Sequence, residues 1–309
     1  MLTYVFYFSS MLVSMYMTIS SIDWFWSWMC MELNLFSFAS IMIYSDSMKK
    51  LEESNCLYFL IQSVGSSILI FGLCLGEINQ SFMFIVILGL FLKLAMYPVN
   101  LLLIGLSSSI SWISLIFISS FMKVPSLYLV NNVSLNCSMV YMFTMMSSVI
   151  WGMQSNCLQK IYMSSSFIHM FWVISVMPGN WIMYWMIYFI FSAVFCLCLN
   201  MMSIYNLKDL LVIDYYKMFN VFLQLLSLAG FPPLIGFLLK LWCFILIDNM
   251  LLSFSLIFFS TLKNFFYIRL ILNLSIFLKM FYKKTNYFNF ANFLLMFSII
   301  LSIMSFKMI

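Results

Sequence analysis

Apolar residues run in blocks along almost the whole chain, and the blocks are long enough to cross a lipid bilayer. A spanning helix needs about 20 predominantly apolar residues. The apolar residues within the blocks do not alternate with polar ones, so the pattern predicts helices rather than strands. The eleven blocks are 2–20, 24–44, 57–76, 81–103, 107–130, 134–153, 158–177, 181–202, 218–247, 250–279 and 288–306. We therefore predict an all-α polytopic membrane protein with about 11 transmembrane helices.

Proline interrupts the fourth and the ninth blocks, and these corresponding positions predict an internal repeat. Pro98 follows Lys93 in the fourth block, and Pro232 and Pro233 precede Lys240 in the ninth. Discontinuous helices in corresponding positions of two halves are typical of transport proteins built from inverted repeats. The alternative is two ordinary proline kinks whose lysines snorkel towards the membrane surface. We predict a single transmembrane domain over 1–309. Within it, helices 1–5 form the first inverted repeat (1–130), helices 6–10 form the second (134–279), and a C-terminal helix follows at 288–306.

Basic residues in the connecting segments follow even-numbered helices only, which predicts the orientation of the helices. Segments after even-numbered helices carry Lys49, Lys50, Lys160, Lys208, Lys217, Lys279, Lys283 and Lys284. Segments after odd-numbered helices carry Asp23, Glu77 and Asp248. Because basic loops stay on the side of synthesis, the N-terminus is predicted on that side and the C-terminus on the opposite one. Lys307 is the exception. Met1 leads directly into an apolar block, so no cleavable targeting sequence is expected.

Composition makes the few charges inside the blocks informative. The chain of 309 residues is 65% hydrophobic and 7% charged. Four ionisable residues nevertheless lie deep within apolar blocks: Glu32, Lys93, Lys123 and Lys240. Each charge at the centre of a bilayer costs about 2.5–3.5 kcal/mol on insertion scales, and such residues usually mark a path for ions or protons.

Lys123 and Glu32 are a candidate pair for proton transfer. Ser119 and Ser120 lie one turn before Lys123, and Glu32 is the only carboxylate deep in a block. Burial disfavours a charged amine and a nearby carboxylate favours it, so a lysine whose partner moves can release and regain a proton. A purely structural ion pair is the alternative.

His169 is the only histidine, and it lies in the middle of the seventh block. Ser165 and Ser166 lie one turn before it. Histidine exchanges protons near neutral pH, so His169 is a candidate relay group, with a hydrogen-bonded packing role as the alternative. The roles of Lys263 and Arg269 stay open, although Arg269 is expected to have a partner.

The remaining residues indicate no further chemistry. The eight cysteines contain no Cys-x-x-Cys pair, so we expect small buried hydrophobes and no zinc or iron–sulfur ligands. No metal site, phosphate-binding loop or nucleophile with an adjacent base is predicted.

Five stretches resemble, in order along the chain, the NADH–ubiquinone oxidoreductase chain 2 family, the antiporter-like membrane subunits of respiratory complex I. They are WSWMCMELNLFSF, YFLIQSVGSSILIF, LQKIYMSSSFIHMFWVI, LSLAGFPPLIGFLLKLW and FFYIRL. The spacing from the proline pair to the lysine is the most specific of these features. Eleven helices also resemble the shortened animal version of this subunit.

This resemblance implies a role for each candidate residue. Glu32 and Lys93 would form a coupling pair, Lys123 a central relay and Lys240 the lysine of the exit half. The subunit would translocate protons across the mitochondrial inner membrane, with its N-terminus on the matrix side and its C-terminus in the intermembrane space. NADH, FMN, iron–sulfur clusters and ubiquinone would bind to other subunits, so no cofactor is expected on this chain.

The resemblance also implies partners, and it leaves alternatives. Expected partners are other membrane-arm subunits of complex I, including antiporter-like and small core chains, and membrane lipids such as cardiolipin, but no nucleic acid. After Pro98 the family usually continues with Phe-His, where this chain has Val99 and Asn100; a histidine contribution from this helix is therefore in doubt. The alternatives are a structural membrane-arm subunit without its own proton path and a free-standing cation/proton antiporter.

Overall fold

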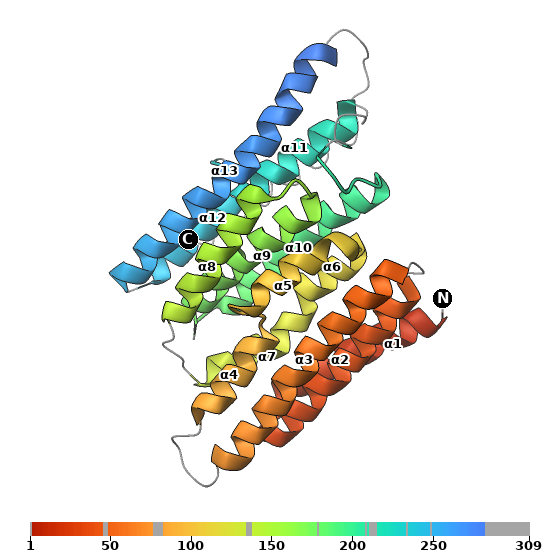
Figure 1. The fold of residues 1–309 in the computed structure, drawn as a ribbon. Helices are drawn as coiled ribbons and strands as arrows, with labels where there is room; N and C mark the ends of the chain where they lie inside the picture. Colours follow the sequence, from red (N-terminus) through yellow and green to blue (C-terminus); the bar gives the residue numbers. More distant parts are fainter. Residues whose placement is uncertain are drawn as a thin grey trace. The chain divides into compact units, whose positions relative to one another are not determined.

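A computed structural model describes residues 2–45, 49–76, 83–133, 138–177, 179–207, 209, 215–232, 234–247 and 249–281. These residues form helices joined by short connections and no β-sheet, as predicted (Figure 1). The helices are α1 (Leu2–Ser20), α2 (Trp24–Ser45), α3 (Lys49–Gly76), α4 (Met83–Lys93), α5 (Val99–Leu106), α6 (Trp112–Ser119), α7 (Val124–Val133), α8 (Ser138–Gln154), α9 (Leu158–Ser175), α10 (Trp181–Met201), α11 (Tyr215–Ala229), α12 (Ile235–Leu246) and α13 (Met250–Phe281). Two 3₁₀ turns, η2 (Ser107–Ser109) and η3 (Phe121–Lys123), connect α5 to α6 and α6 to α7.

The chain divides into two compact units, residues 1–147 and 148–309. This division rests on contacts and does not test the predicted inverted repeats, which stay a prediction. In unit 1, α1 packs on α2, α2 on α3 and α3 on α4, and these helices lie side by side in the red to orange part of the ribbon (Figure 1).

Two glycines allow α3 and α4 to pack with their backbones in contact. A Cβ atom on Gly89 would lie 2.8 Å from the Cα of Leu69, and one on Gly72 would lie 2.7 Å from the backbone nitrogen of Val86. Small residues permit this close approach of membrane helices, which associate mainly through van der Waals contact. The close packing brings polar residues of α3, such as Gln62, next to Lys93 at the end of α4.

In unit 2, α9 is the central helix. Between Leu158 and Ile174 only Lys160 is not buried, and α10, α12 and α13 all pack against α9. Its polar residues, among them Gln159, Ser165 and His169, are thereby enclosed by protein and not exposed to lipid, where polar groups are costly. Its position explains why the side chains of α9, including His169, face other helices on every side.

The outward surfaces of the helices are apolar, as expected of a multi-pass membrane protein. Phe6, Met139 and Leu251, for example, are exposed. Four described helical segments are individually long and apolar enough to cross a membrane: Glu53–Gly76, Trp112–Val133, Trp181–Met201 and Met250–Leu272. The count of eleven spans stays a prediction, and the block at 288–306 lies outside the described residues.

Two expectations need correction. The block at 107–130 is not one regular helix, because α6 ends at Ser119 and α7 begins at Val124. Pro125 explains the interruption: within a continuous helix its ring would clash with the carbonyl four residues earlier. Of the cysteines, Cys30, Cys196 and Cys243 are buried as expected, but Cys56 and Cys74 are exposed. Lipid accepts apolar side chains on the outside of a helix, so these two need no protein cover.

Candidate functional site

The fourth predicted span is broken directly after Lys93. The N–H of Met96 donates to the carbonyl of Phe91, and the N–H of Ala95 donates to that of Leu92. Ala95 has a left-handed φ of 56°. This is a Schellman motif, which ends a helix by satisfying two of its last carbonyls. The sequence predicted a discontinuous helix here, and the structure ends it with alanine in a position where glycine is usual.

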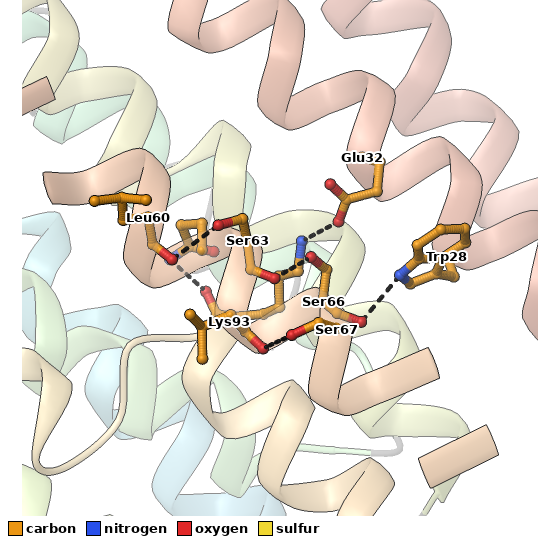
Figure 2. A network of polar contacts seen from close by, with 9 residues as sticks. Trp28, Glu32, Leu60, Ser63, Ser66, Ser67 and Lys93 are labelled. Atoms are coloured by element: carbon orange, nitrogen blue, oxygen red, sulfur yellow. Dashed lines mark hydrogen bonds and ion pairs between the residues drawn. The ribbon is translucent and has the colours of Figure 1, made fainter. Parts of the chain in front are cut away.

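Lys93 forms an ion pair with Glu32, as the family resemblance implied. Its Nζ lies 3.0 Å from Oε1 of Glu32, and the two side chains are 6% and 17% exposed. Figure 2 shows the lysine of α4 pointing to the carboxylate of α2, with Ser63 and Ser66 of α3 beside it. A cation and an anion from two different helices thus meet in the interior of unit 1.

Neighbouring polar side chains hold the backbone around this pair. The side-chain amide of Gln62 donates to the carbonyl of Lys93 at 3.3 Å, which satisfies an acceptor left open at the end of α4. The indole of Trp28, one turn before Glu32, donates to the carbonyl of Ser66 at 3.1 Å (Figure 2). Both contacts join α3 to the helices that carry the charged groups.

Lys123 lies at the second interruption, as the last residue of η3. It is 2% exposed. The hydroxyl groups of Ser119 and Ser120 both donate to the carbonyl of Ile116, so the serines predicted to solvate Lys123 also hold the end of α6. The carboxylate of Glu32, predicted from the residues as the partner of Lys123, is engaged by Lys93. A direct exchange between Lys123 and Glu32 stays a prediction.

The third interruption separates α11 from α12. Phe231 N–H donates to the carbonyl of Leu226, Gly230 N–H donates to that of Ser227, and Gly230 has a φ of +79°. The same Schellman motif therefore ends α11 and α4. Lys240 of α12 folds back to this break and donates from Nζ to the carbonyl of Ala229 at 2.6 Å. The predicted break and its lysine are thus in contact.

His169 is held by a hydrogen bond at each ring nitrogen. Nδ1 lies 2.9 Å from the hydroxyl of Tyr184, and Nε2 lies 2.8 Å from Nζ of Lys263. The lysine also donates to the carbonyl of Leu228 at 2.9 Å. Sequence reasoning left the role of Lys263 open. Its place in the middle of the apolar segment Met250–Leu272 was the available signal.

Arg269 has the partner that was expected, a pair of backbone carbonyls at the end of α8. Its guanidinium donates to the carbonyl of Met153 at 2.6 Å and to that of Ser155 at 2.5 Å. These carbonyls lie at the C-terminal end of α8, where cations are favoured by the helix dipole and by the lack of intrahelical donors. Arg269 therefore closes the end of α8 against α13.

The five predicted site residues thus fall into both units. Glu32 and Lys93 are in direct contact within unit 1, where Lys123 is also buried. Lys240 and His169 lie in unit 2, joined through the end of α11 and Lys263. Lys93 and Lys123 lie at interruptions of helices, and the amine of Lys240 reaches the end of α11, where backbone carbonyls lack intrahelical donors.

Comparison with known proteins gives relatives that cover most of the chain. No protein-family model matches the chain. It is 31% identical over 284 residues to NADH-ubiquinone oxidoreductase chain 2 of Myxine glutinosa, covering 82% of this chain and 80% of the relative. It is 28% identical over 285 residues to the protein of the same name from Lumbricus terrestris, covering 86% and 84%.

Solved structures share the fold. A chain of respiratory complex I from Thermus thermophilus matches with a TM-score of 0.78 and 14% identity, covering 89% of this chain and 71% of that one. A chain of the Mrp complex from Dietzia sp. matches with a TM-score of 0.69 and 15% identity, covering 87% and 59%. At these identities the structural matches concern the fold alone.

Proposed function

The chain belongs to the NADH-ubiquinone oxidoreductase chain 2 family, and on this premise we propose that it relays protons within the membrane arm of respiratory complex I. The proposed path uses the Glu32–Lys93 pair, Lys123 and Lys240, with His169 as a further relay group. Proton movement would be coupled to NADH oxidation and ubiquinone reduction in other subunits, which would also hold the redox cofactors.

The ion pair between Lys93 and Glu32 is the observation that carries this proposal. Two charged side chains 3.0 Å apart occupy the interior of a unit whose outer surface is apolar. Ionisable residues inside membrane segments are expensive and usually belong to ion or proton paths. A lysine beside a carboxylate holds its proton more firmly than a lysine in an apolar pocket. Separation and approach of the two groups would therefore release and regain one proton.

Helix breaks supply the second support. Lys93 and Lys123 lie at the ends of helical segments, and Lys240, from within α12, reaches the broken end of α11 with its amine. Non-helical backbone at membrane depth is tolerated where protein or a hydrated cavity satisfies its polar groups. An interruption also allows the lysine to exchange one backbone acceptor for another without unwinding a regular helix. The lysines are therefore placed where small rearrangements change their hydrogen bonds.

We further propose the mitochondrial inner membrane as the location, with the N-terminus in the matrix. The basic residues that follow even-numbered helices support this orientation through the positive-inside rule. Other membrane-arm subunits of complex I would be the protein partners, and lipids such as cardiolipin would cover the apolar outer faces.

Replacement of the lysines tests the relay. Complex I assembled with Lys123→Met or Lys240→Met should lose coupled NADH:ubiquinone turnover and proton uptake in sealed vesicles, while native gels show normal assembly. Assembly of Lys240→Met is expected because the amide of Asn264, turned so that its nitrogen faces the carbonyls, also donates to the carbonyl of Ala229 at 2.8 Å. Lys160→Met, at the less buried start of α9, is the matched control. Normal coupled turnover in both variants would exclude the relay.

A structural subunit without a proton path is the second candidate, favoured by the capping role of Arg269. In that case the lysine variants would assemble poorly and pump normally per assembled complex. A free-standing antiporter, the third candidate, would migrate in native gels apart from the band that stains for NADH dehydrogenase activity. Mass spectrometry of that band distinguishes it from a complex I subunit.

A further inference from the structure

The C-terminal end of α11 is held by two lysines from two other helices. A helix leaves its last four carbonyls without intrahelical partners. The Schellman motif satisfies the first two of these at α11, and the last two, at Leu228 and Ala229, accept hydrogen bonds from Lys263 and Lys240 respectively. Two amines that can each carry a proton therefore bind to consecutive carbonyls of one helix end.

Lys263 is the more deeply placed of the two. It is fully buried, with an exposed fraction of 0%, and its Nζ contacts Nε2 of His169 at 2.8 Å as well as the carbonyl of Leu228 at 2.9 Å. A neutral amine has two N–H donors and an ammonium has three. Two acceptors are therefore compatible with either form, and Lys263 can lose a proton without leaving its place.

No carboxylate among the residues that the structure describes balances the charge at this site. In the described parts of the chain, neither Lys240, Lys263 nor His169 contacts an acidic side chain; the ion pair found there joins Lys93 to Glu32. The compensating charge is the C-terminal end of α11, equivalent to about half a negative elementary charge. Three basic groups that share so little negative charge cannot all be protonated together, because the like charges repel.

We propose that Lys263 is a further proton-relay residue, which exchanges a proton with His169 and shares the end of α11 with Lys240. The inference rests on the proposed proton-relay function and adds a group to it. In the transfer step, the N–H bond of the Lys263 ammonium that points to His169 breaks and an N–H bond forms at Nε2. The lysine is left as an amine that accepts from Nε2–H and still donates to the carbonyl of Leu228.

The histidine is prepared for this step by its second hydrogen bond. Because Lys263 donates to Nε2, neutral His169 must carry its proton on Nδ1 and donate it to the hydroxyl oxygen of Tyr184. After transfer the ring is an imidazolium that keeps both contacts. Both protonation states of the pair therefore use the same hydrogen-bond geometry.

Among the described residues, phenols also face the pair, with the thiols of Cys196 and Cys243 beyond them. The ring of Tyr188 lies 4.7 Å from that of His169, and Nζ of Lys263 lies 5.7 Å from the ring centre of Tyr267. An ordinary phenol keeps its proton at neutral pH. The groups that exchange a proton at this site are thus Lys263, His169 and Lys240.

Two substitutions of Lys263 separate titration from hydrogen bonding. Lys263→Arg keeps a donor that is always charged, and Lys263→Gln keeps a neutral donor. Complex I with each variant is examined in sealed vesicles for assembly, for coupled turnover and for the pH profile of that turnover. Thr261→Val, on the exposed side of α13, is the control. We expect normal assembly, coupled turnover reduced roughly tenfold or more, and a changed pH profile in both variants.

The outcomes are distinct. Normal turnover of assembled Lys263→Arg and Lys263→Gln, or reduced turnover with an unchanged pH profile, overturns the inference and leaves Lys263 as a helix cap. If neither variant assembles, His169→Gln decides: its amide oxygen can accept from Lys263 but cannot carry the proton, so normal coupled turnover overturns the exchange. Lys123→Met and Lys240→Met tested in parallel distinguish the two proposals, because normal pumping in both would remove the proposed function itself, whereas loss of pumping there with normal turnover at Lys263 would remove only the inference about Lys263.

Discussion

Replacing Glu32 by Gln removes one charge from the ion pair with Lys93 and nearly preserves the size of the side chain. At the Nζ–Oε1 distance of 3.0 Å and an effective dielectric constant of about 20, the lost attraction is about 5–6 kcal/mol. Desolvation of the two groups offsets part of it, and removal of one partner from a buried pair typically costs about 3–5 kcal/mol. Lys93 can avoid the unpaired charge by losing its proton, which for an ordinary lysine at neutral pH costs about 4–5 kcal/mol.

Both routes therefore place the penalty of Glu32→Gln at about 4 kcal/mol, which corresponds to roughly a thousandfold change in an equilibrium constant. We expect coupled NADH:ubiquinone turnover of the assembled complex to fall roughly tenfold or more, together with proton uptake into sealed vesicles. Glu53→Gln removes an exposed carboxylate from α3 and is the matched control, with turnover expected to be unchanged.

The double variant Glu32→Gln/Lys93→Met tests the energetic reasoning separately from the function. It removes both charges, so no unpaired ion is buried, and native gels should show more assembled complex than Glu32→Gln alone. Its coupled turnover should stay low, because no proton carrier is left at this position. Normal coupled turnover in Glu32→Gln would refute the role of the pair in the relay. Assembly of the double variant no better than that of Glu32→Gln would refute the energetic argument.

Three further substitutions test the packing that holds these groups. Gly230→Ala should impair pumping, because the new methyl group would lie 2.6 Å from Nζ of Lys240. The φ of +79° at this residue adds about 1–2 kcal/mol of strain for alanine. A normal ratio of protons pumped to electrons transferred would contradict the prediction. Arg269→Met should lower the free energy that stabilises the complex by about 1.5–3 kcal/mol for each lost charged hydrogen bond, seen as a lower temperature of thermal inactivation. The number of protons pumped per electron should stay unchanged, and a changed ratio would argue against a purely structural role. Gly89→Ala should reduce assembly on native gels, because its Cβ would lie 2.8 Å from the backbone of Leu69; wild-type amounts of complex would show that α3 and α4 can separate without loss.

Local features of the sequence were sufficient for the helices and for two of the interruptions. Apolar length predicts a helix because lipid offers no partner for backbone N–H and C=O groups. Proline predicts a break because it lacks an N–H and its ring blocks the preceding turn. The break beside Gly230 and the one before Pro98 were predicted for this reason. The break at Ser120 was missed, although Pro125 was a signal for it, because the apolar block continues on both sides.

Partners within the helix bundle were decided only by the tertiary structure. The sequence by itself determined that Glu32, Lys93, Lys123, Lys240 and His169 are ionisable groups within apolar segments. The family resemblance implied that Glu32 pairs with Lys93, but only the tertiary structure brings them together across 61 positions, and only it joins His169 to Lys263 across 94. The physical reason is that a pair between helices depends on the rotation and depth of both, which close packing over their whole length sets. A lysine in an apolar block must find a partner, but the packing of all helices chooses which one.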